Sequence, residues 1–345
     1  MNAKIITFFN HKGGVSKTTT TYNVGWKLTE KDKKILLVDG DPQCNLTGMV
    51  LGDEFDNYYT NEETKNNNIK DAVKVAFEGK PRPIQSIECI TPKENDKLFL
   101  IPGHMDFSEY EPSLSLALNS NNAITTLQNL PGSFYELIKL CCERYSIDYV
   151  LIDMNPGLSA INQTFFMYSD MFLVPTNPDP FSIMALKTLS KVLPRWKRWS
   201  IQSSELFEEA SYPMPKAKMR FAGEIIQRFN LRNGKAAKPY QGKMEEIQDY
   251  IENIFVPELE KVDMLYDITR LKSEQIISSY CISQISEFGA LLQKANNNLV
   301  PVFALTEEQI HESGTVLANM LHKRNQFDGE FEVIAEVILE LINNE

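Results

Sequence analysis

Short apolar runs recur along this chain, and each ends at a polar or glycine-containing turn. Stretches of helical composition separate the runs, one from Thr18 to about Lys31 and another over Phe134–Arg144. Strands that alternate with helices in this way predict a parallel sheet with helices on both faces. The strands that we expect are Lys4–Phe9, Ile35–Val38, Tyr149–Ile152, Met171–Val174, Phe221–Ile226 and Leu299–Leu305. The fold class is therefore α/β, with a doubly wound, mostly parallel sheet.

Three stretches exceed what a minimal fold of this kind needs, near residues 53–96, 105–130 and 240–298. We interpret them as insertions within a single domain that spans residues 1–345. Asp53–Asn68 is polar and rich in asparagine, Glu111–Asn129 is expected to be partly helical, and Lys243–Lys261 has a mostly helical period. A final helix is predicted by an apolar face made of Phe331, Ile334, Val337, Ile338, Leu341 and Ile342.

The composition is that of a globular protein with a sizeable core. The chain has 345 residues and is 43% hydrophobic, which argues against disorder. Its formal net charge of -11 argues against a surface that is coated with nucleic acid throughout. A local basic face can still bind phosphates. Because the five cysteines are scattered, we expect reduced thiols rather than a zinc site or a disulfide framework. No segment approaches the about 18 apolar residues that span a bilayer, so we expect a cytoplasmic protein.

A glycine-containing loop follows the first predicted strand and reads His11-Lys12-Gly13-Gly14-Val15-Ser16-Lys17-Thr18-Thr19. Backbone N–H groups turn inward to a polyphosphate where residues tolerate unusual dihedral angles, as Gly13 and Gly14 do. The start of the next helix adds partial positive charge. Lys17 would then reach the β- and γ-phosphates, and the Thr18 hydroxyl would ligate Mg²⁺.

The loop departs from the ordinary pattern G-x-x-x-x-G-K-[ST], since His11 and Ser16 stand where glycines would be. The narrower pattern K-G-G-x-x-K-T fits, and by it the chain resembles the deviant Walker A P-loop ATPases of the ParA/MinD group, most closely the ParA partition type. The resemblance implies that ATP joins two subunits, with Lys12 of one subunit contacting the phosphates bound by the other. It also implies the nucleotide-binding residues Lys12, Gly13, Gly14, Val15, Ser16, Lys17, Thr18 and Thr19.

Two acidic strand ends strengthen the resemblance. Asp39-Gly40-Asp41-Pro42-Gln43 is similar to the switch I segment of this group, which implies that Asp41 orients the attacking water and that Asp39 helps to hold the magnesium shell. The run from Tyr149 to Gly157 is similar to the Walker B strand and switch II, with Asp153 as a further magnesium residue. The implied catalytic residues are Lys12, Lys17 and Asp41, and the implied metal residues are Thr18, Asp39 and Asp153.

The match is thinner beyond the run Phe172–Pro178, which is similar to the next strand and loop of the group. Gly223–Arg232 resembles the strand whose end approaches the adenine, and Gln227 stands there in a place often taken by Thr or Asn. The resemblance implies nonspecific DNA contacts by Arg232, and a second basic cluster with interleaved tryptophans is formed by Arg195, Lys197 and Arg198. We interpret Trp196 and Trp199 as core residues rather than as platforms for bases.

These observations lead to one main functional hypothesis. The chain is expected to be a Mg²⁺-dependent ATPase and dimerisation switch for plasmid or chromosome partition or cargo positioning. Its activity would be weak and stimulated by a ParB-like or other adaptor protein, and its ATP dimer would bind DNA nonspecifically and associate with the nucleoid.

Three alternative functions share parts of this pattern. A MinD-like positioning ATPase would end in a basic amphipathic helix, whereas residues 331–345 are apolar on one side and acidic on the other, so we expect no membrane partner. A metabolic ATPase on the same scaffold fits less well. An accessory ATPase of a defence or mobile element system remains open, because it would share the switch and differ only in its cargo.

Overall fold

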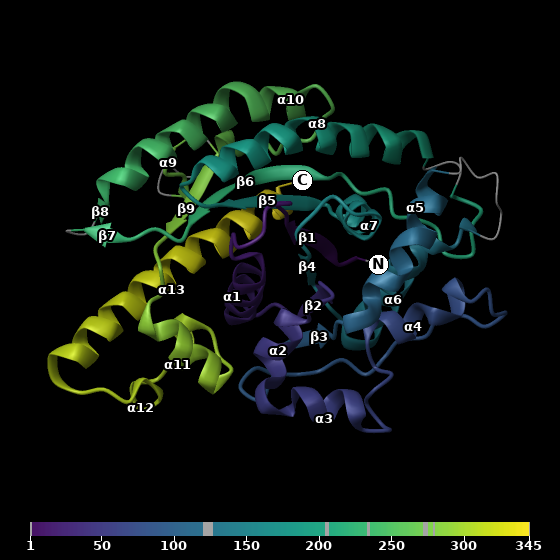
Figure 1. The fold of residues 1–345 in the computed structure, drawn as a ribbon, viewed down its shortest axis with the longest axis horizontal. Coiled ribbons are helices and arrows are strands. Elements are labelled where there is room, and N and C mark those ends of the chain that lie inside the picture. Colours follow the sequence, from purple (N-terminus) through teal and green to yellow (C-terminus); the bar gives the residue numbers. More distant parts are fainter. Residues whose placement is uncertain are drawn as a thin grey trace.

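The architecture is a parallel sheet between two layers of helices, as the computed structural model in Figure 1 shows. The structure describes residues 2–119, 127–203, 207–232, 235–271, 275–278 and 280–344. The sheet has seven strands in the order β3-β2-β4-β1-β5-β6-β9, and every strand pair in it is parallel. The strands are β1 (Lys4–Phe8), β2 (Ile35–Gly40), β3 (Leu98–Ile101), β4 (Tyr149–Met154), β5 (Met171–Thr176), β6 (Arg220–Gln227) and β9 (Cys281–Ile285). A separate antiparallel hairpin consists of β7 (Leu231–Arg232) and β8 (Lys235–Ala236).

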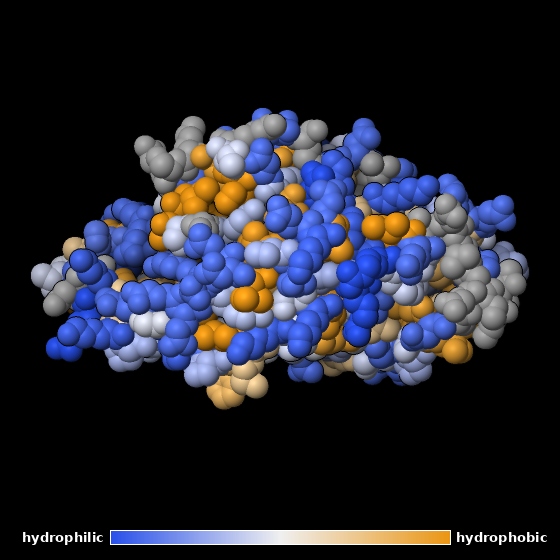
Figure 2. All heavy atoms as spheres, turned by 90° about the horizontal axis from the view of Figure 1, so that it is seen from above, coloured by the Kyte–Doolittle hydropathy of each residue, from blue (hydrophilic) through white to orange (hydrophobic). Residues whose placement is uncertain are grey.

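Helices cover both faces of the sheet. They are α1 (Lys17–Glu30), α2 (Asn45–Leu51), α3 (Phe55–Thr60), α4 (Ile69–Phe77), α5 (Glu111–Asn119), α6 (Leu130–Tyr145), α7 (Ala160–Tyr168), α8 (Pro180–Ser203), α9 (Lys238–Tyr250), α10 (Val256–Glu260), α11 (Ala290–Asn298), α12 (Glu307–Ile310) and α13 (Gly314–Asn343). Within the described residues, no helix is long and apolar enough to cross a membrane. Figure 2 shows that the face over α8, α9 and α10 is mostly hydrophilic, with small separate apolar patches.

The core has two halves because side chains alternate across each strand. In β1, Ile5 packs into the half that lies under α4 to α9, whereas Ile6 and Phe8 pack into the half under α1, α11 and α13. In β2, Leu36 and Leu37 divide in the same way. Both faces of these strands are therefore buried, which explains their continuous apolar runs.

The predicted fold class is confirmed, and one predicted strand is wrong. Leu299–Leu305 does not form a strand: it contains a 3₁₀ turn, Val302–Ala304, and Pro301 cannot donate to a sheet ladder. The edge strand next to β6 is β9 instead, and the sequence analysis also missed β3. Both missed strands are short and lie at the two edges of the sheet.

The predicted insertions contain ordered helices. Asp53–Asn68 includes α3, Glu111–Asn129 begins with α5, and Lys243–Lys261 is helical with a π turn at Ile251–Phe255. Residues 120–126 lie outside the described residues. The apolar face of the final helix is confirmed, since all six of its predicted residues are buried in α13.

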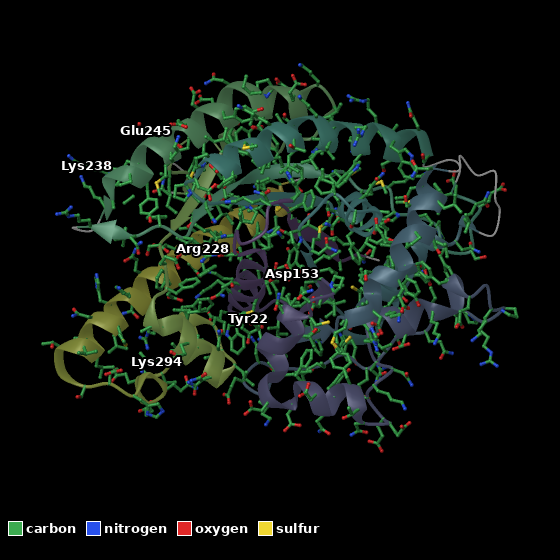
Figure 3. All side chains as sticks on the ribbon, viewed as in Figure 1. Tyr22, Asp153, Arg228, Lys238, Glu245 and Lys294 are labelled. Carbon is green, nitrogen blue, oxygen red and sulfur yellow. The ribbon has the colours of Figure 1, made fainter. Side chains whose placement is uncertain are left out.

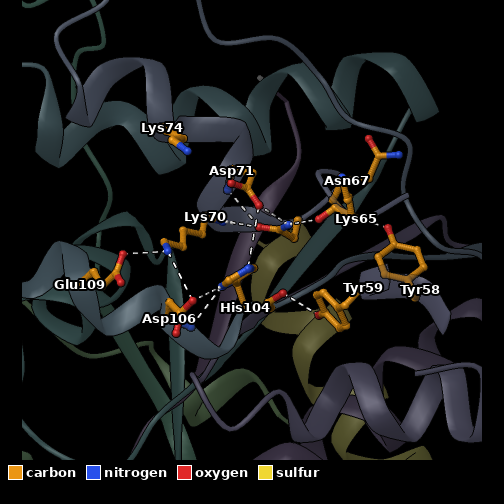
Figure 4. A network of polar contacts seen from close by, with 12 residues as sticks. Tyr58, Tyr59, Lys65, Asn67, Lys70, Asp71, Lys74, His104, Asp106 and Glu109 are labelled. Carbon is orange, nitrogen blue, oxygen red and sulfur yellow. Dashed lines mark hydrogen bonds and ion pairs between the residues drawn. The ribbon is translucent and has the colours of Figure 1, made fainter. Parts of the chain in front are cut away.

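A polar network ties the first insertion to the rest of the molecule (Figure 4). The Lys70 ammonium of α4 pairs with the Glu109 carboxylate at 2.8 Å, and the Tyr59 hydroxyl of α3 donates to the Gly103 carbonyl at 2.7 Å. Because Gly103 follows β3, α3 is fixed directly to the edge of the sheet.

Candidate functional site

A cavity of about 550 Å³ opens where the strands of the sheet end. Parallel α/β sheets present ligands at the carboxyl ends of their strands, and loops that follow β1, β2, β4, β6 and β9 meet here. Figure 3 shows Asp153 and Arg228 near the centre of the molecule, next to α1. The wall consists of Gly13–Thr19, Asp41, Gln43, Asn45, Met49, Met154, Pro156, Gln227, Arg228, Ile285–Phe288, Leu292 and Asn296.

The loop between β1 and α1 has the backbone geometry of an anion site. Gly14 (φ +71°) and Ser16 (φ +58°) both adopt the left-handed region, which turns the chain sharply before α1 begins at Lys17. The N-cap residue Ser16 makes no side-chain capping hydrogen bond to the first turn of α1. The N–H groups of a 14-residue helix therefore face the cavity with partial positive charge.

Lys17 is buried, and its ammonium lies under the loop. It donates to the carbonyl oxygens of Asn10 at 2.9 Å and Lys12 at 3.0 Å. Burial lowers the pKa of Lys17, while the nearby Asp153 and Asp41 carboxylates raise it. These contacts hold the loop in its curved form and keep a cation at the base of the cavity, as the sequence predicts.

Two acidic strand ends lie side by side, because Asp39 of β2 pairs in register with Asp153 of β4. Burial raises the pKa of Asp39 to about 6. The Asp39 carboxylate accepts hydrogen bonds from the Thr47 N–H (2.8 Å), the Thr47 hydroxyl (2.6 Å) and the Asp41 N–H (3.2 Å). Asp39 therefore fixes α2 and the following loop, and its predicted role at magnesium remains a prediction.

The Asp153 carboxylate is fully buried, and neither oxygen makes a hydrogen bond of normal geometry with the described residues. Burial, followed by the Asp39 carboxylate, raises its pKa to about 8, against the opposing influence of the Thr18 hydroxyl and the Lys17 ammonium. An unpartnered buried carboxylate is costly unless something satisfies it. A hard cation next to Thr18 would do so, because Mg²⁺ prefers oxygen ligands.

Asp41 and Lys12 lie in different surroundings. Asp41 lines the cavity, and its carboxylate accepts a hydrogen bond from the Gln43 N–H at 2.9 Å. Lys12 does not line the cavity: its ammonium contacts the Asp179 carboxylate at 2.5 Å and the Ser182 hydroxyl at 3.3 Å. Burial alone would raise the pKa of Asp179, but the hydrogen bonds from the Lys12 ammonium and the Ser182 N–H outweigh burial, so the pKa of Asp179 is lowered overall.

The far wall contains residues that the sequence analysis did not find. Ile285–Phe288 follow β9, and Leu292 and Asn296 belong to α11. The one signal that could have found them is their position after a strand of the sheet, and that strand was not predicted. Gln227 was predicted and does line the cavity, where its amide donates to the Thr20 hydroxyl of α1 at 2.7 Å.

The predicted DNA-binding residues do not form one surface. Arg195 and Arg198 are exposed on the second half of α8, whereas Arg232 is exposed on β7, at the opposite side of the molecule in Figure 1. Lys197 must be removed from the set, because it is buried and its ammonium donates to the Lys218 carbonyl at 2.7 Å. Burial lowers the pKa of Lys197 accordingly.

Trp196 and Trp199 both pack with the core, as expected. Trp196 is buried against Phe9 and Phe166. Trp199 is partly buried, and its indole N–H donates to the Leu118 carbonyl of α5 at 3.1 Å.

Comparison with known proteins identifies a family and relatives for this chain. Residues 3–203 match the family model AAA_31, described as an AAA domain. The chain is 28% identical over 253 residues to an uncharacterized protein of Methanocaldococcus jannaschii, which covers 72% of this chain and 81% of that protein. It is 30% identical over 190 residues to the chromosome partitioning protein ParA of Myxococcus xanthus, with 55% of this chain and 58% of the relative covered.

Two solved structures share the fold along nearly the whole chain. Apo McdA from Cyanothece has a TM-score of 0.56 and 17% identity, with 97% of this chain and 99% of that chain covered. A putative plasmid partition protein from Borrelia burgdorferi, bound to AMPPNP, has a TM-score of 0.54 and 19% identity, with 99% of both chains covered. The chain covers less of the ParA relatives found by sequence: 58% of the Myxococcus protein and 65% of a ParA family protein from Mycoplasma pneumoniae.

Proposed function

This chain belongs to the AAA_31 family of AAA domains and to the ParA-type group of deviant Walker A ATPases within it, and from that we propose that it is an ATP-driven dimerisation switch for partition or cargo positioning. The observation that carries the proposal is the unpartnered Asp153 carboxylate beside Thr18 and Lys17. A cavity with a helix N-terminus, a buried lysine and an unsatisfied carboxylate suits a nucleoside triphosphate with its metal ion.

The residues present fit magnesium. Thr18 lines the cavity and would offer its hydroxyl, while Asp153 lies behind it and would offer its carboxylate. Bound there, the metal would neutralise charge on the phosphates. Lys17 would bind the phosphates from below the loop, and Asp41, on the cavity wall, would orient the attacking water.

Lys12 supports the dimer part of the proposal, because its neighbourhood is open to a second copy. Phe181 and Met184, at the start of α8, are 65% and 61% exposed and lie within a few residues of Asp179 and Ser182, which contact Lys12. Apolar side chains exposed beside a cation that is itself mostly covered, at 17% exposure of the Lys12 side chain, suit a contact that forms only with ATP. In the dimer, Lys12 would leave Asp179 and reach the partner's nucleotide.

DNA and an adaptor complete the proposed cycle. Arg195, Arg198 and Arg232 are exposed cations that would hold duplex phosphates without reading sequence, which would place the ATP dimer on the nucleoid. The ParA names of the relatives support an adaptor of the ParB kind that stimulates hydrolysis.

The proposal is tested by two variants whose effects differ in kind. Lys17→Ala should lose ATP binding, because it removes the cation under the loop. Asp41→Ala should bind ATP and form a dimer while hydrolysing slowly, since it removes only the residue that orients water. Nucleotide titration, light scattering after size exclusion with ATP and Mg²⁺, and phosphate release measure these three properties.

Lys12→Ala is the matched control for dimerisation. It should bind ATP as a monomer, because the loop and Lys17 stay intact. Phosphate release at the parental rate in both Lys17→Ala and Asp41→Ala would refute the assignment, as would an Asp41→Ala variant that stays monomeric with ATP at every protein concentration.

A further inference from the structure

Arg228 is a cation on the cavity wall that the functional assignment leaves without a role. It follows Gln227 at the end of β6, and its backbone adopts the left-handed region, with φ +62°. For a residue with a Cβ this conformation is strained, and such strain is concentrated at functional sites. The Arg228 N–H donates to the Ile285 carbonyl at 3.0 Å, which holds the turn against the end of β9.

The guanidinium of Arg228 lies over the phosphate loop. Its Nη1 donates to the Gly14 carbonyl at 2.9 Å, and its Nε donates to the Glu287 carboxylate at 3.3 Å. Guanidinium carries five N–H donors, so these two contacts leave three donors without a partner among the described residues. The side chain is 48% exposed, and its free donors can therefore meet a ligand.

The balance of charge in the cavity makes this position informative. The charged residues of the wall are Lys17, Asp41, Arg228 and Glu287. Lys12 is held by Asp179 outside the wall, so within the described residues Lys17 and Arg228 are the cations that line the cavity. A polyphosphate carries several negative charges, and Lys17 alone would neutralise only one of them.

We propose that Arg228 binds the phosphate chain of the nucleotide held by its own subunit, through the guanidinium donors that its contacts with Gly14 and Glu287 leave unused. The inference rests on the proposed nucleotide site and adds to it a phosphate-binding residue from the same subunit. A planar fork of N–H donors matches phosphate oxygens. Contact with Gly14 places the fork at the phosphate loop, whereas the apolar wall residues Met49, Phe288 and Leu292 suit the base.

The test measures ADP binding, so that dimer formation does not contribute. Arg228→Gln should weaken the binding of ADP with Mg²⁺ by about 10- to 100-fold in a calorimetric titration, the effect expected for removing hydrogen bonds to a charged group. Arg228→Lys should recover part of that affinity, since it restores charge without the fork. The salt dependence of ADP binding should become shallower in Arg228→Gln, because one charge interaction has been removed.

Glu287→Gln is the matched control, and it separates phosphate binding from a structural tie. If Arg228 only ties the loop after β6 to the loop after β9, removing either partner should weaken ADP binding equally. If Arg228 binds phosphate, Glu287→Gln should bind ADP as well as the parent or better, because it frees the guanidinium. Equal weakening by the two variants overturns the proposal.

Lys17→Ala distinguishes this inference from the function on which it rests. Abolished ADP binding in Lys17→Ala together with parental affinity and salt dependence in Arg228→Gln would overturn the role of Arg228 alone. Parental ADP affinity in both variants would overturn the nucleotide site itself. A thermal midpoint within about 2 °C of the parent shows that Arg228→Gln is folded.

Discussion

Lys12 contacts a carboxylate of its own chain, and this contact competes with its proposed role in a second subunit. The Lys12 ammonium donates to Asp179, which also caps the first turn of α8 by accepting from the Ser182 N–H at 2.8 Å. A lysine must give up the first partner before it can reach another. The strength of the Lys12–Asp179 contact should therefore set how readily ATP produces a dimer.

Asp179→Asn tests this competition at the residue scale. The amide keeps an oxygen for the Ser182 N–H but removes the charge that holds Lys12, so dimerisation with ATP should occur at a several-fold lower protein concentration. Sedimentation or light scattering over a concentration series measures the shift. Asp179→Ala, which also removes the cap, should in addition lose about 1 kcal/mol of stability. A dimerisation constant equal to the parent's in Asp179→Asn would contradict the competition.

Glu224 is a second residue with a measurable effect, because its ionisation should change the stability of the fold with pH. It is fully buried in β6, where one carboxylate oxygen accepts from the Thr176 hydroxyl at 2.5 Å and the other has no partner among the described residues. Burial raises its pKa from 4.5 to about 8. The Cys281 thiol of the neighbouring strand titrates only above that range, because burial and the Glu224 carboxylate raise its pKa.

The raised pKa of Glu224 has a definite sign for stability. The folded chain holds a proton that the unfolded chain releases above about pH 4.5, so this residue destabilises the fold increasingly as the pH rises from about 5 to about 8. Glu224→Gln should remove this contribution to the pH dependence of stability, and its thermal midpoint should exceed the parent's more at pH 8 than at pH 5. Thr176→Val should keep the loss of stability between pH 5 and pH 8. If the thermal midpoints of the parent and Glu224→Gln change in parallel with pH, Glu224 does not titrate in this range.

At the scale of the element, the start of α8 is the feature with the clearest consequence for assembly. Phe181 and Met184 are exposed in the first turns of the helix, next to the residues that contact Lys12. If this surface meets a second copy, Phe181→Ser with Met184→Ser should weaken the ATP dimer by at least about tenfold while leaving monomer ADP binding unchanged. Ile201→Ser, near the far end of the same helix and 60% exposed, is the control that should leave the dimer intact. Equal effects of the two sets would place the interface elsewhere.

The elements that sequence could predict are those whose pattern is local. Buried parallel strands give continuous apolar runs, and the central strands β1, β2, β4, β5 and β6 were found in this way. The edge strands β3 and β9 were missed, because β3 has only four residues and because the polar Ser283 and Gln284 interrupt the apolar run of β9. Leu299–Leu305 is equally apolar, but its side chains are buried by packing of a 3₁₀ turn and not by a ladder.

The residues of the candidate site also differ in whether a local sequence pattern predicts them. The phosphate loop, Asp41 and Asp153 follow one another in motifs of fixed spacing, so the sequence alone indicated them. Arg228 and Glu287 lie 59 residues apart and meet only because β6 and β9 are neighbours. The burial of Lys197 was equally hidden, since it depends on which side of α8 faces the core. Such facts come from tertiary packing and leave no local pattern.

At the scale of the whole molecule, the net charge of -11 limits how DNA can be held. Repulsion acts over most of the surface, so retention must depend on a few exposed cations. Arg195→Ala with Arg198→Ala should weaken duplex binding equally for two unrelated sequences and reduce the salt slope by about 1 for each phosphate that is no longer bound. Arg232→Ala tests the hairpin separately. Lys197→Ala, which removes a buried ammonium, is the control that should leave binding unchanged, and parental binding at low salt by both arginine variants would exclude these surfaces.

The long helix α13 has a consequence for the molecule as a whole. Its second half is clamped to α1 by the pairs Lys27–Asp328 and Lys31–Glu332, whereas Phe327 is its first buried residue. Residues 314–326 extend about 20 Å beyond that pivot, at about 1.5 Å per residue, and they remain packed on the fold, since Leu317, Met320 and Leu321 contact the core and the Arg324 guanidinium donates to the Leu305 carbonyl at 2.9 Å. A tilt of α1 would therefore be passed to the start of α13 together with the residues packed against it, so a fluorophore near Gly314 would report, from a distance, on events at the opposite end of α1.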